Sequence, residues 1–382
     1  MHFTISHRDS GGQARTGLLE LAHGAVPTPV FMPVGTNATV KAIAQEQLEA
    51  MGVRIILANA YHLYLRPGLE VLRAAGGLHS FMSWTANILT DSGGFQIFSL
   101  AGNTTIEEQA VRFRSHLDGS EHRLSPEEVV DFQLDAGSDV LMPLDICTPV
   151  GISAAEAREA LERTARWAAR SMHRWREAPS EGKGCLFGII QGNFYPQLRR
   201  ASAELTLESD FPGYAIGGLS VGEPFGVFQE LLALTAALIP EDRPRYLMGV
   251  GSPEYILEAV ENGIDMVDCV LPTRTARNAQ AFTRLGPLSL KNEPNRLSRQ
   301  PIDANCGCPT CRRYTRSYLR HLYKCREILA AMLTTHHNLY FLQELMASIR
   351  EAIRENRFAR FKREFLESYR TAVMDGARDA EQ

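Results

Sequence analysis

The sequence predicts an α/β fold and, within that class, a (β/α)8 barrel of the TIM type. Short apolar runs rich in β-branched residues alternate with longer stretches in which apolar residues recur every three or four positions, as in amphipathic helices. Seven or eight such strand–helix units fit within about 250 residues of this 382-residue chain, which is the usual size of a barrel. Most of the apolar runs also end in a polar residue or a glycine.

The apolar runs are expected to form the parallel strands, and they cover residues 54–59, 87–91, 139–145, 184–192, 214–219, 245–250 and 263–270. A set of polar residues and glycines stands at or near their carboxyl ends: Asn59, Asp91, Asp145, Gln191, Gly217–Gly218, Met248–Gly249 and Asp268. Each alone would more often be a turn residue than a functional one. Several together indicate a site, because barrel active sites form at the carboxyl ends of the strands.

The intervening stretches 154–175 and 252–263 have helical periodicity. Ser153, and Ser252 followed by Pro253, are suited to helix N-caps. An open doubly wound sheet is the alternative architecture. Its dinucleotide-binding version is disfavoured, because no G-x-G-x-x-G sequence follows the first strand.

The composition is that of a soluble globular protein, with 45% hydrophobic and 22% charged residues. The N-terminus lacks the apolar core of a signal peptide, and no run of about 20 apolar residues predicts a membrane span. Seven cysteines, an odd number, favour a reducing, cytoplasmic location. The net charge is −4, yet residues 271–326 hold twelve Lys/Arg and two acidic residues. This asymmetry favours a polyanion-binding surface, and a solvated basic face is the alternative.

Two carboxylates are candidate catalytic groups. Asp91 lies in "TDSGGFQIFS", where two glycines let the backbone turn beside a ligand and Phe95 offers an aromatic face. Asp268 closes an apolar run beside a basic loop, where a carboxylate is costly unless it is paired or used. Paired carboxylates are the usual means of cleaving a bond at the anomeric carbon of a sugar. The alternatives are an Asp-capped turn at Asp91 and an ion pair of Asp268 with Arg274 or Arg277.

The segments "CGCPTC" and "TTHHN" predict a metal site. Cys306, Cys308, Cys311 and His337 supply three thiolates and one imidazole, which suit tetrahedral zinc. Because four protein ligands leave no open coordination position, one structural zinc per chain is expected. His336 could replace His337 as the fourth ligand, and Cys325 is a further alternative.

The stretch "AIGGLSVGEP", residues 215–224, is a candidate ligand-binding loop. Gly217 and Gly218 allow backbone groups to come close to a planar ligand. Glu223 could bind a cationic or amine group, and the alternative is a surface acid near the start of a helix. The remaining cysteines of the apolar runs are expected to be core or pocket residues: Cys147, Cys185 and Cys269.

Taken in order, "ILTDSGGFQIFSL", "GIIQGN", "AIGGLSVGEP", "RYLMGVG", "DMVDCVLPTRTARN" and "CGCPTC…HN" resemble the motifs of tRNA-guanine transglycosylases. The resemblance covers nearly the whole chain. It implies a barrel over residues 1–290, a zinc-binding subdomain over 291–345 inserted near the last barrel units, and C-terminal helices over 346–382. It also implies a homodimer whose contact region includes Tyr314, Tyr318 and His321; the alternative is an aromatic cluster internal to the subdomain.

Enzymes of this family are pentosyltransferases that replace the wobble guanine of tRNAs with GUN anticodons by a 7-deazaguanine, in queuosine biosynthesis. The resemblance implies that Asp268 attacks the ribose anomeric carbon and that Asp91 moves the proton for the departing and incoming bases. It implies a base pocket made of Phe95, Asp145, Cys147, Gln191, Gly218, Leu219, Glu223 and Met248. Arg274 and Arg277 would contact the anticodon loop, and zinc would be held by Cys306, Cys308, Cys311 and His337.

The incoming base is expected to be 7-aminomethyl-7-deazaguanine, with queuine as the alternative. "LSVGE" is of the bacterial type, and eukaryotic members that use queuine have a smaller residue at the position of Val221. The chain departs from the bacterial pattern at Ile146, where a glutamate usually stands. Two rival functions remain: a non-catalytic RNA-binding barrel, which would be expected to lack one carboxylate, and a hydrolytic glycosidase, which would need a water route and no basic surface.

Overall fold

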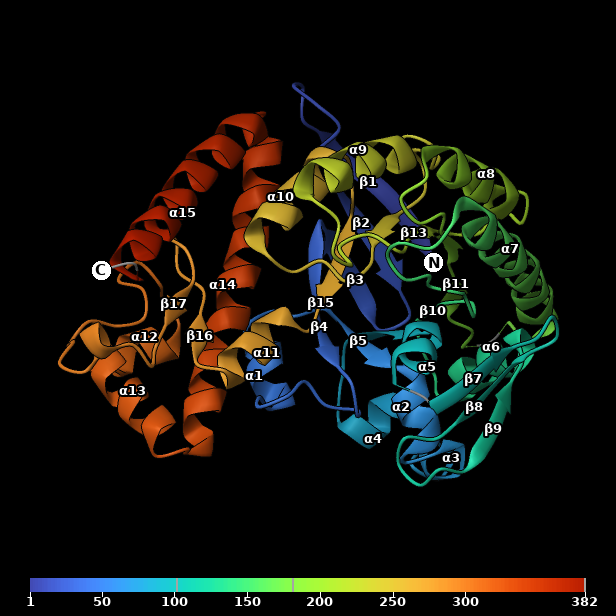
Figure 1. Cartoon of the computed structure of the whole chain (residues 1–382), viewed down its shortest axis with the longest axis horizontal. Coiled ribbons are helices and arrows are strands. Elements are labelled where there is room, and N and C mark those ends of the chain that lie inside the picture. Colours follow the sequence, from blue (N-terminus) through green and yellow to red (C-terminus); the bar gives the residue numbers. More distant parts are fainter. Residues whose placement is uncertain (101, 181, 381–382) are drawn as a thin grey trace.

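A parallel barrel forms the centre of the protein, shown in Figure 1 as a computed structural model that describes residues 1–100, 102–180 and 182–380. Its strands, in spatial order, are β11 (Cys185–Leu186), β10 (Val140–Leu141), β6 (Asn87–Asp91), β5 (Ile55–Asn59), β4 (Val30–Gly35), β15 (Met266–Cys269), β14 (Arg245–Leu247), β13 (Tyr214–Ile216) and β12 (Gly188–Ile190).

The first and last strands of this order are consecutive in the chain and separated only by Phe187. The Phe187 N–H donates to Leu141 O at 3.0 Å, and the next N–H, of Gly188, donates to Gly213 O at 2.9 Å. One bent strand therefore pairs with β10 on one side and with β13 on the other. This bend closes the sheet, and the predicted (β/α)8 barrel is confirmed.

All seven predicted strands are present, and the eighth, β4, lies where the sequence analysis indicated none. Its residues are buried throughout, and it pairs in parallel with β5 and β15. The sequence VFMPVG contains Pro33, and proline within an apolar run argues against a central strand because it cannot donate to the ladder. The hydrogen bonds of the flanking residues keep this strand in the barrel.

Helices surround the barrel. In chain order they are α1 (Gln45–Ala50), α2 (Ala60–Leu65), α3 (Leu69–Ala74), α4 (Leu78–Met82), α5 (Gly94–Leu100), α6 (Pro126–Asp135), α7 (Ala154–Glu177), α8 (Pro196–Leu207), α9 (Phe225–Ala236), α10 (Pro253–Glu261) and α11 (Leu271–Arg277). In Figure 1 they extend from the blue α2, α3 and α4 at the bottom, through the green α7 on the right, to the yellow-green α9 at the top. Ser153 caps α7 by accepting the Glu156 N–H, as predicted. Ser252 takes the N-cap position of α10 without a side-chain cap bond.

Two antiparallel sheets flank the barrel: β1 (His2–Arg8), β2 (Arg15–Leu21) and β3 (Gly24–Thr28), and β7 (Gly102–Ile106), β8 (Val111–Arg114) and β9 (Glu121–Leu124). From the first sheet, Leu19 and Val26 pack with the inward-facing side chains of the barrel strands, including Met32 and Leu57. The interior is therefore a packed core.

The C-terminal part follows the last barrel strand and lies on the left of Figure 1, in orange and red. It contains β16 (Gln280–Ala281), β17 (Leu288–Ser289), the 3-10 helix η1 (Glu293–Asn295), α12 (Pro309–Arg313), α13 (Arg316–Lys324), α14 (Ile328–Arg354) and α15 (Phe358–Ala380). Helix α14 is continuous across residues 345 and 346, where the sequence analysis placed a boundary.

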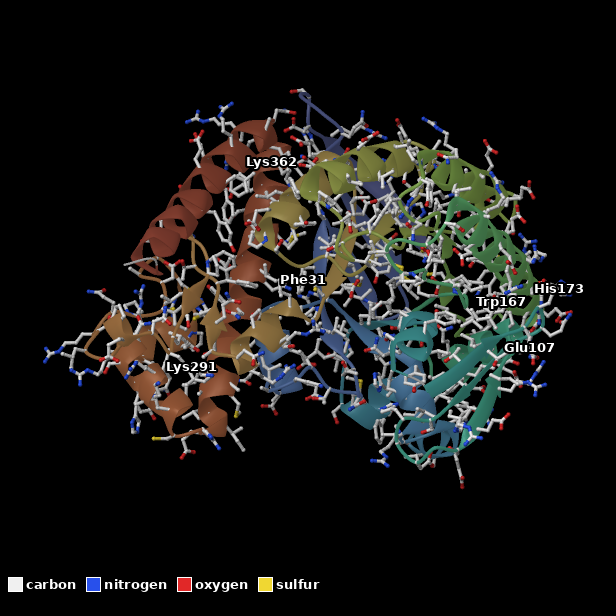
Figure 2. All side chains as sticks on the ribbon, viewed as in Figure 1. Phe31, Glu107, Trp167, His173, Lys291 and Lys362 are labelled. Carbon is white, nitrogen blue, oxygen red and sulfur yellow. The ribbon has the colours of Figure 1, made fainter. Side chains whose placement is uncertain are left out.

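Helices α14 and α15 attach this part to the barrel. From α14, Gln343 Nε2 donates to Phe31 O of β4 at 3.3 Å, and Arg350 Nη1 donates to Pro29 O at 2.8 Å. From α15, Lys362, labelled in Figure 2, donates to Glu258 of α10 at 2.7 Å. Among the described residues, no helix combines the length and the apolar character needed to cross a membrane.

Candidate functional site

A cavity of about 330 Å³ opens at the carboxyl ends of the barrel strands. Residues from eight barrel strands or the loops that follow them line it, so its composition depends on the closure of the barrel. The residues predicted from sequence that line it are Asp91, Phe95, Asp145, Cys147, Gln191, Gly218, Leu219, Met248, Asp268 and Arg274. The structure thus gathers in one place groups that are up to 183 positions apart, counting from Asp91 to Arg274.

Asp91 ends β6 and is buried. Its Oδ1 accepts the Ala60 N–H at 2.9 Å, and its Oδ2 accepts N–H groups from the Asn59 and Gln96 side chains, the latter at 3.1 Å. The pKa of the Asp91 carboxyl is raised to about 7. Burial is the main cause and the Asp268 charge contributes, whereas these hydrogen bonds lower the pKa. A carboxyl with that pKa can both give and take a proton near neutral pH.

Asp268 stands near the end of β15, also buried. Its Oδ1 accepts the Tyr246 hydroxyl at 2.6 Å and the Gly249 N–H at 2.8 Å. Burial raises the pKa of the Asp268 carboxyl, and these two donors oppose that rise. In the described part of the chain its hydrogen-bond partners do not include Arg274 or Arg277, so the alternative of an arginine ion pair is not what the structure shows.

A further buried, hydrogen-bonded group lines the cavity. The Asp145 carboxylate accepts the Ser92 hydroxyl at 3.0 Å and the Gln191 side-chain amide at 2.7 Å. Such a carboxylate with an adjacent amide can pair with the donors and acceptors on the edge of a purine-like base. Phe95 is 55% exposed at the cavity, and Met248 is half-buried, so both can contact the faces of a flat ligand.

The loop after β13 forms another wall of the cavity, and Glu223 organises it. The Glu223 carboxylate accepts the N–H groups of Ser220, of Val221 at 2.9 Å and of Gly222 at 3.1 Å. It does not line the cavity. The expectation that Glu223 itself meets an amine is therefore corrected: the carboxylate is used to satisfy the donors of its own tight loop.

Arg274 and Arg277 lie on α11, which begins two residues after β15. Arg274 lines the cavity, whereas Arg277 is one helical turn further and donates to Thr273 O at 2.9 Å. Both can approach a charged ligand that extends beyond the cavity mouth. Together with the basic residues of the following segment, they give this side of the protein its positive charge.

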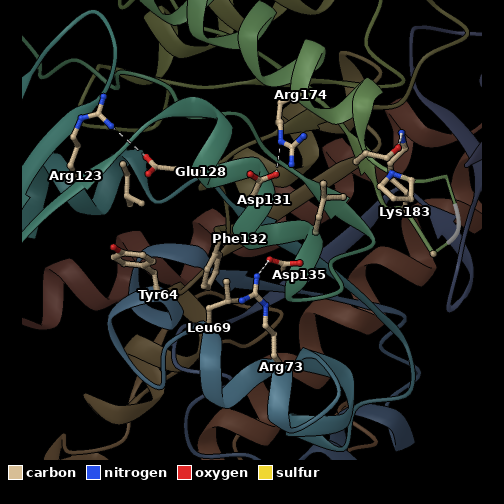
Figure 3. Close-up of a pocket in the computed structure, with 15 residues that line it drawn as sticks. Tyr64, Leu69, Arg73, Arg123, Glu128, Asp131, Phe132, Asp135, Arg174 and Lys183 are labelled. Carbon is tan, nitrogen blue, oxygen red and sulfur yellow. Dashed lines mark hydrogen bonds and ion pairs between the residues drawn. The ribbon is translucent and has the colours of Figure 1, made fainter.

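A larger cavity, of about 620 Å³, lies on the barrel flank between α3, α6 and the end of α7. Figure 3 shows that its arginines and carboxylates are paired with one another: Arg123 with Glu128, Arg174 with Asp131, and Arg73 with Asp135. Its carboxylates are thus neutralised by their neighbours. The strand-end cavity, with its two carboxylates without arginine partners, is the stronger candidate for chemistry.

The predicted metal ligands converge in the C-terminal part. His337 Nδ1, on α14, lies 3.6, 3.5 and 3.3 Å from the sulfur atoms of Cys306, Cys308 and Cys311. Its Nε2 is 2.6 Å from Phe282 O, which fixes the tautomer that leaves Nδ1 free for a metal. The donor atoms all lie within 4.8 Å of one another, so this cluster can hold a metal ion. The alternatives His336 and Cys325 are not in the cluster.

A second group, His23, His79 and Asp139, lies at the amino end of the strands. Its carboxylate oxygens are 2.7 Å from His23 Nδ1 and 3.1 Å from His79 Nε2, and one also accepts the Ile88 N–H. These hydrogen bonds satisfy the group by themselves. The cysteine cluster is therefore the stronger of the two candidates for a metal site.

Sequence reasoning missed the residues that hold the two carboxylates and the loop. Tyr246 and Gln96 donate to Asp268 and Asp91, and Arg199 donates to the carbonyls of Gly217 and Gly218. Gln96 lies within the motif around Asp91 and could have been found there. Tyr246 and Arg199 carry no local signal, because an aromatic residue in a strand and an arginine in a helix are ordinary.

Comparison with known proteins identifies the family of this chain. A family model described as "Queuine tRNA-ribosyltransferase" matches residues 9–371. A protein of that name from Treponema denticola is 51% identical over 367 residues, covering 96% of this chain and 97% of its own length. One from Desulforudis audaxviator is 53% identical over 364 residues, covering 95% and 97%. The protein is thus a ribosyltransferase built on a (β/α)8 barrel. The chain belongs to the queuine tRNA-ribosyltransferase family.

Proposed function

We propose that this protein exchanges the wobble guanine of tRNAs with GUN anticodons for 7-aminomethyl-7-deazaguanine, as a step of queuosine biosynthesis. The observation that carries the proposal is the pair of buried carboxylates, Asp91 and Asp268, at one cavity beside the arginines of α11. Such a pair suits substitution at an anomeric carbon. The flanking arginines suit the phosphates of an RNA whose base is turned out into the cavity.

In the proposed reaction, the Asp268 carboxylate attacks ribose C1′ and the bond from C1′ to the guanine nitrogen breaks. The departing guanine takes its proton from Asp91. The incoming base then attacks C1′ of the Asp268 ester, gives its proton to Asp91 and releases the Asp268 carboxylate. Two inversions leave the sugar configuration unchanged, and no cofactor or water takes part in either step.

The first half of this reaction is expected to depend on pH through Asp91. Because the pKa of its carboxyl is raised to about 7, the acid form is present below that pH and is lost above it. In single-turnover experiments, release of radioactive guanine from tRNA should slow as the pH rises through about 7. Asp91→Asn should release guanine very slowly at every pH. A rate that stays constant from about pH 6 to pH 8 would contradict this role.

The 7-substituent of the incoming base is expected to lie near the loop after β13. Since Glu223 binds the Ser220 N–H, the carbonyl of Leu219 in the same peptide turns the opposite way and can accept from an ammonium group. Val221 lines the cavity and restricts its volume. Ile146, where the chain departs from the family pattern, packs in an apolar cluster with Tyr61 and Ile97 and does not line the cavity.

We therefore expect kcat/KM for 7-aminomethyl-7-deazaguanine to exceed that for queuine by roughly tenfold or more on the same tRNA, because a bulky cyclopentenyl group would clash with a closed pocket. Val221→Gly should narrow the difference by admitting queuine. Ile146→Glu is the matched control and should leave the ratio within about twofold. Equal values for the two bases in the wild-type protein would support queuine as the substrate instead.

We propose that the metal of the Cys306, Cys308, Cys311 and His337 cluster is zinc. The separations of 3.3–3.6 Å between His337 Nδ1 and the sulfur atoms agree with the separation of about 3.5 Å that tetrahedral Zn–S and Zn–N bonds impose. When bound, the ion would hold the segment before α12, α12 itself and α14 together. It would take no part in the exchange, because its four ligands leave no open position.

We also propose that two copies associate through the face formed by α1, α12, α13 and the start of α14. Ile328 is 77% exposed there, and Tyr318, Leu329 and Met332 are also exposed. Such a group of apolar side chains is typical of a protein–protein contact. Tyr314 and Tyr318 stack on each other, at 5.6 Å between ring centroids, next to this face.

Sedimentation of the wild-type protein should give twice the chain mass. The Ile328→Asp variant should sediment with the mass of one chain.

A further inference from the structure

We infer that Arg199 is a positioning residue for base recognition: it turns two consecutive backbone N–H groups, of Gly218 and Leu219, toward the cavity and so selects bases that carry an acceptor such as the 6-carbonyl of guanine. The inference rests on the proposed function. It assigns a role to a residue that does not itself line the cavity.

Arg199, on α8, is fully buried. Its Nη1 donates to Gly217 O at 2.7 Å, its Nη2 donates to Gly218 O at 3.0 Å, and its Nε donates to Asn193 O at 2.9 Å. Among the described residues, all of its hydrogen-bond acceptors are backbone carbonyls. Burial lowers the pKa of its guanidinium to about 10, which leaves the group charged at neutral pH. Burying the guanidinium charge costs free energy, and here the group donates only to backbone carbonyls. This indicates that Arg199 serves to hold this stretch of backbone in one conformation.

The direction of the two carbonyls determines the direction of the N–H groups. Both peptide bonds are trans, and in a planar trans peptide the N–H points opposite to the C=O. The Gly217 carbonyl points to Arg199, so the Gly218 N–H points away from it. The Gly218 carbonyl also points to Arg199, so the Leu219 N–H points away as well. Gly218 and Leu219 line the cavity and Arg199 does not, so away from Arg199 means toward the cavity.

These two N–H groups have no acceptor among the described residues, although Leu219 is only 3% exposed. Buried backbone donors without partners are rare in folded proteins, and adjacent N–H groups with a common direction form a concave site for an electronegative atom. Gly218 has φ 66°, the left-handed conformation that such adjacent donors commonly need. An acceptor atom of a bound base would complete the hydrogen bonding of this wall.

Gln191 adds an independent restriction at the same place. A Cβ on Gly217 would lie 2.6 Å from Gln191 Nε2, and a Cβ on Gly218 would lie 2.6 Å from Gln191 Oε1. The loop therefore packs directly against the amide that also binds Asp145. Arg199 fixes the loop from one side and Gln191 from the other, so the two N–H groups have little freedom to turn.

The test compares guanine with 2-aminopurine, which lacks the 6-carbonyl. The KM for guanine in exchange into tRNA and the Ki of 2-aminopurine as a competitor are measured for the wild-type protein, Arg199→Lys and Arg199→Met. Lysine keeps the charge but cannot bridge two carbonyls. We expect KM for guanine to rise about tenfold or more in both variants, with the Ki of 2-aminopurine nearly unchanged.

Neither constant depends on the fraction of protein that is folded, so partial misfolding of a variant does not imitate the result. Arg245→Lys, another buried arginine that donates to a backbone carbonyl but lies at the amino end of β14, should leave both constants as in the wild type. Equal weakening for both bases in the Arg199 variants, or no change for either, would overturn the inference. Failure of the wild-type protein to incorporate guanine at all would instead contradict the proposed function.

Discussion

Replacing Asp268 by asparagine is expected to abolish base exchange while tRNA binding remains. The amide is nearly isosteric, and its oxygen can still accept from the Tyr246 hydroxyl and the Gly249 N–H, so the end of β15 should keep its structure. What is lost is the negative charge that, in the proposed mechanism, forms the ester with ribose. We expect turnover to fall by at least about a thousandfold, as is common when a nucleophile that acts within a catalytic group is removed.

The proposed covalent intermediate allows a more direct measurement. When the wild-type protein is mixed with tRNA and denatured, a protein–RNA adduct should survive electrophoresis, and Asp268→Asn should give none. Binding of tRNA, measured by filter retention, should change by less than about threefold, since the arginine contacts remain. Asp242→Asn, an exposed carboxylate outside the cavity, is the control for removal of a negative charge. Near-normal turnover of Asp268→Asn would refute the proposed mechanism.

Replacing Cys308 by serine is expected to remove the metal and to destabilise the C-terminal part. Cys308 is buried, and its sulfur lies 3.5 Å from His337 Nδ1. A structural metal contributes directly to the free energy of folding, because the assembled ligands do not exist in the unfolded chain. We expect about one zinc per chain in the wild type and less than about a tenth of that in the variant. The midpoint of thermal unfolding should fall by at least about 5 °C.

Cys325→Ser is the matched control, because Cys325 is exposed and lies outside the cluster. It should retain its metal and the wild-type unfolding temperature. Elemental analysis and differential scanning calorimetry on the same preparations make the two measurements. Full zinc content in Cys308→Ser would show that the cluster is not the metal site, and an unchanged unfolding temperature without zinc would show that the metal is not structural.

The sequence predicted those features that depend on short stretches. The carboxylates at the ends of β6 and β15 follow from the position of an aspartate after an apolar run. The metal cluster follows from three closely spaced cysteines. The barrel follows from the alternation of apolar runs with helical stretches. This is a strong signal because every strand–helix unit shows it. Strand β4 was the exception. Its proline argues against a strand, although the closure of the barrel requires one at this place.

Features that depend on contacts between distant residues could not be predicted in this way. The hydroxyl of Tyr246 reaches Asp268, and the Arg199 guanidinium reaches the loop after β13, only because the barrel brings neighbouring strands together. Glu223 was expected to face a ligand, because an acid in a glycine-rich segment suggests one. The loop that contains Glu223 has three N–H groups that need an acceptor, and the Glu223 carboxylate accepts all three.

The continuity of α14 has a consequence for how the protein can be divided. This helix carries His337 near its beginning and, further on, Gln343 and Arg350, which bind the backbone of β4 and the residue before it. A 27-residue helix is about 40 Å long and does not bend easily, so the metal cluster and the barrel are attached to one rigid rod. Fragments separated within this helix would each lose part of their own hydrophobic core. The two regions are therefore expected to unfold together, and neither can be exchanged for a homologous part without the whole helix.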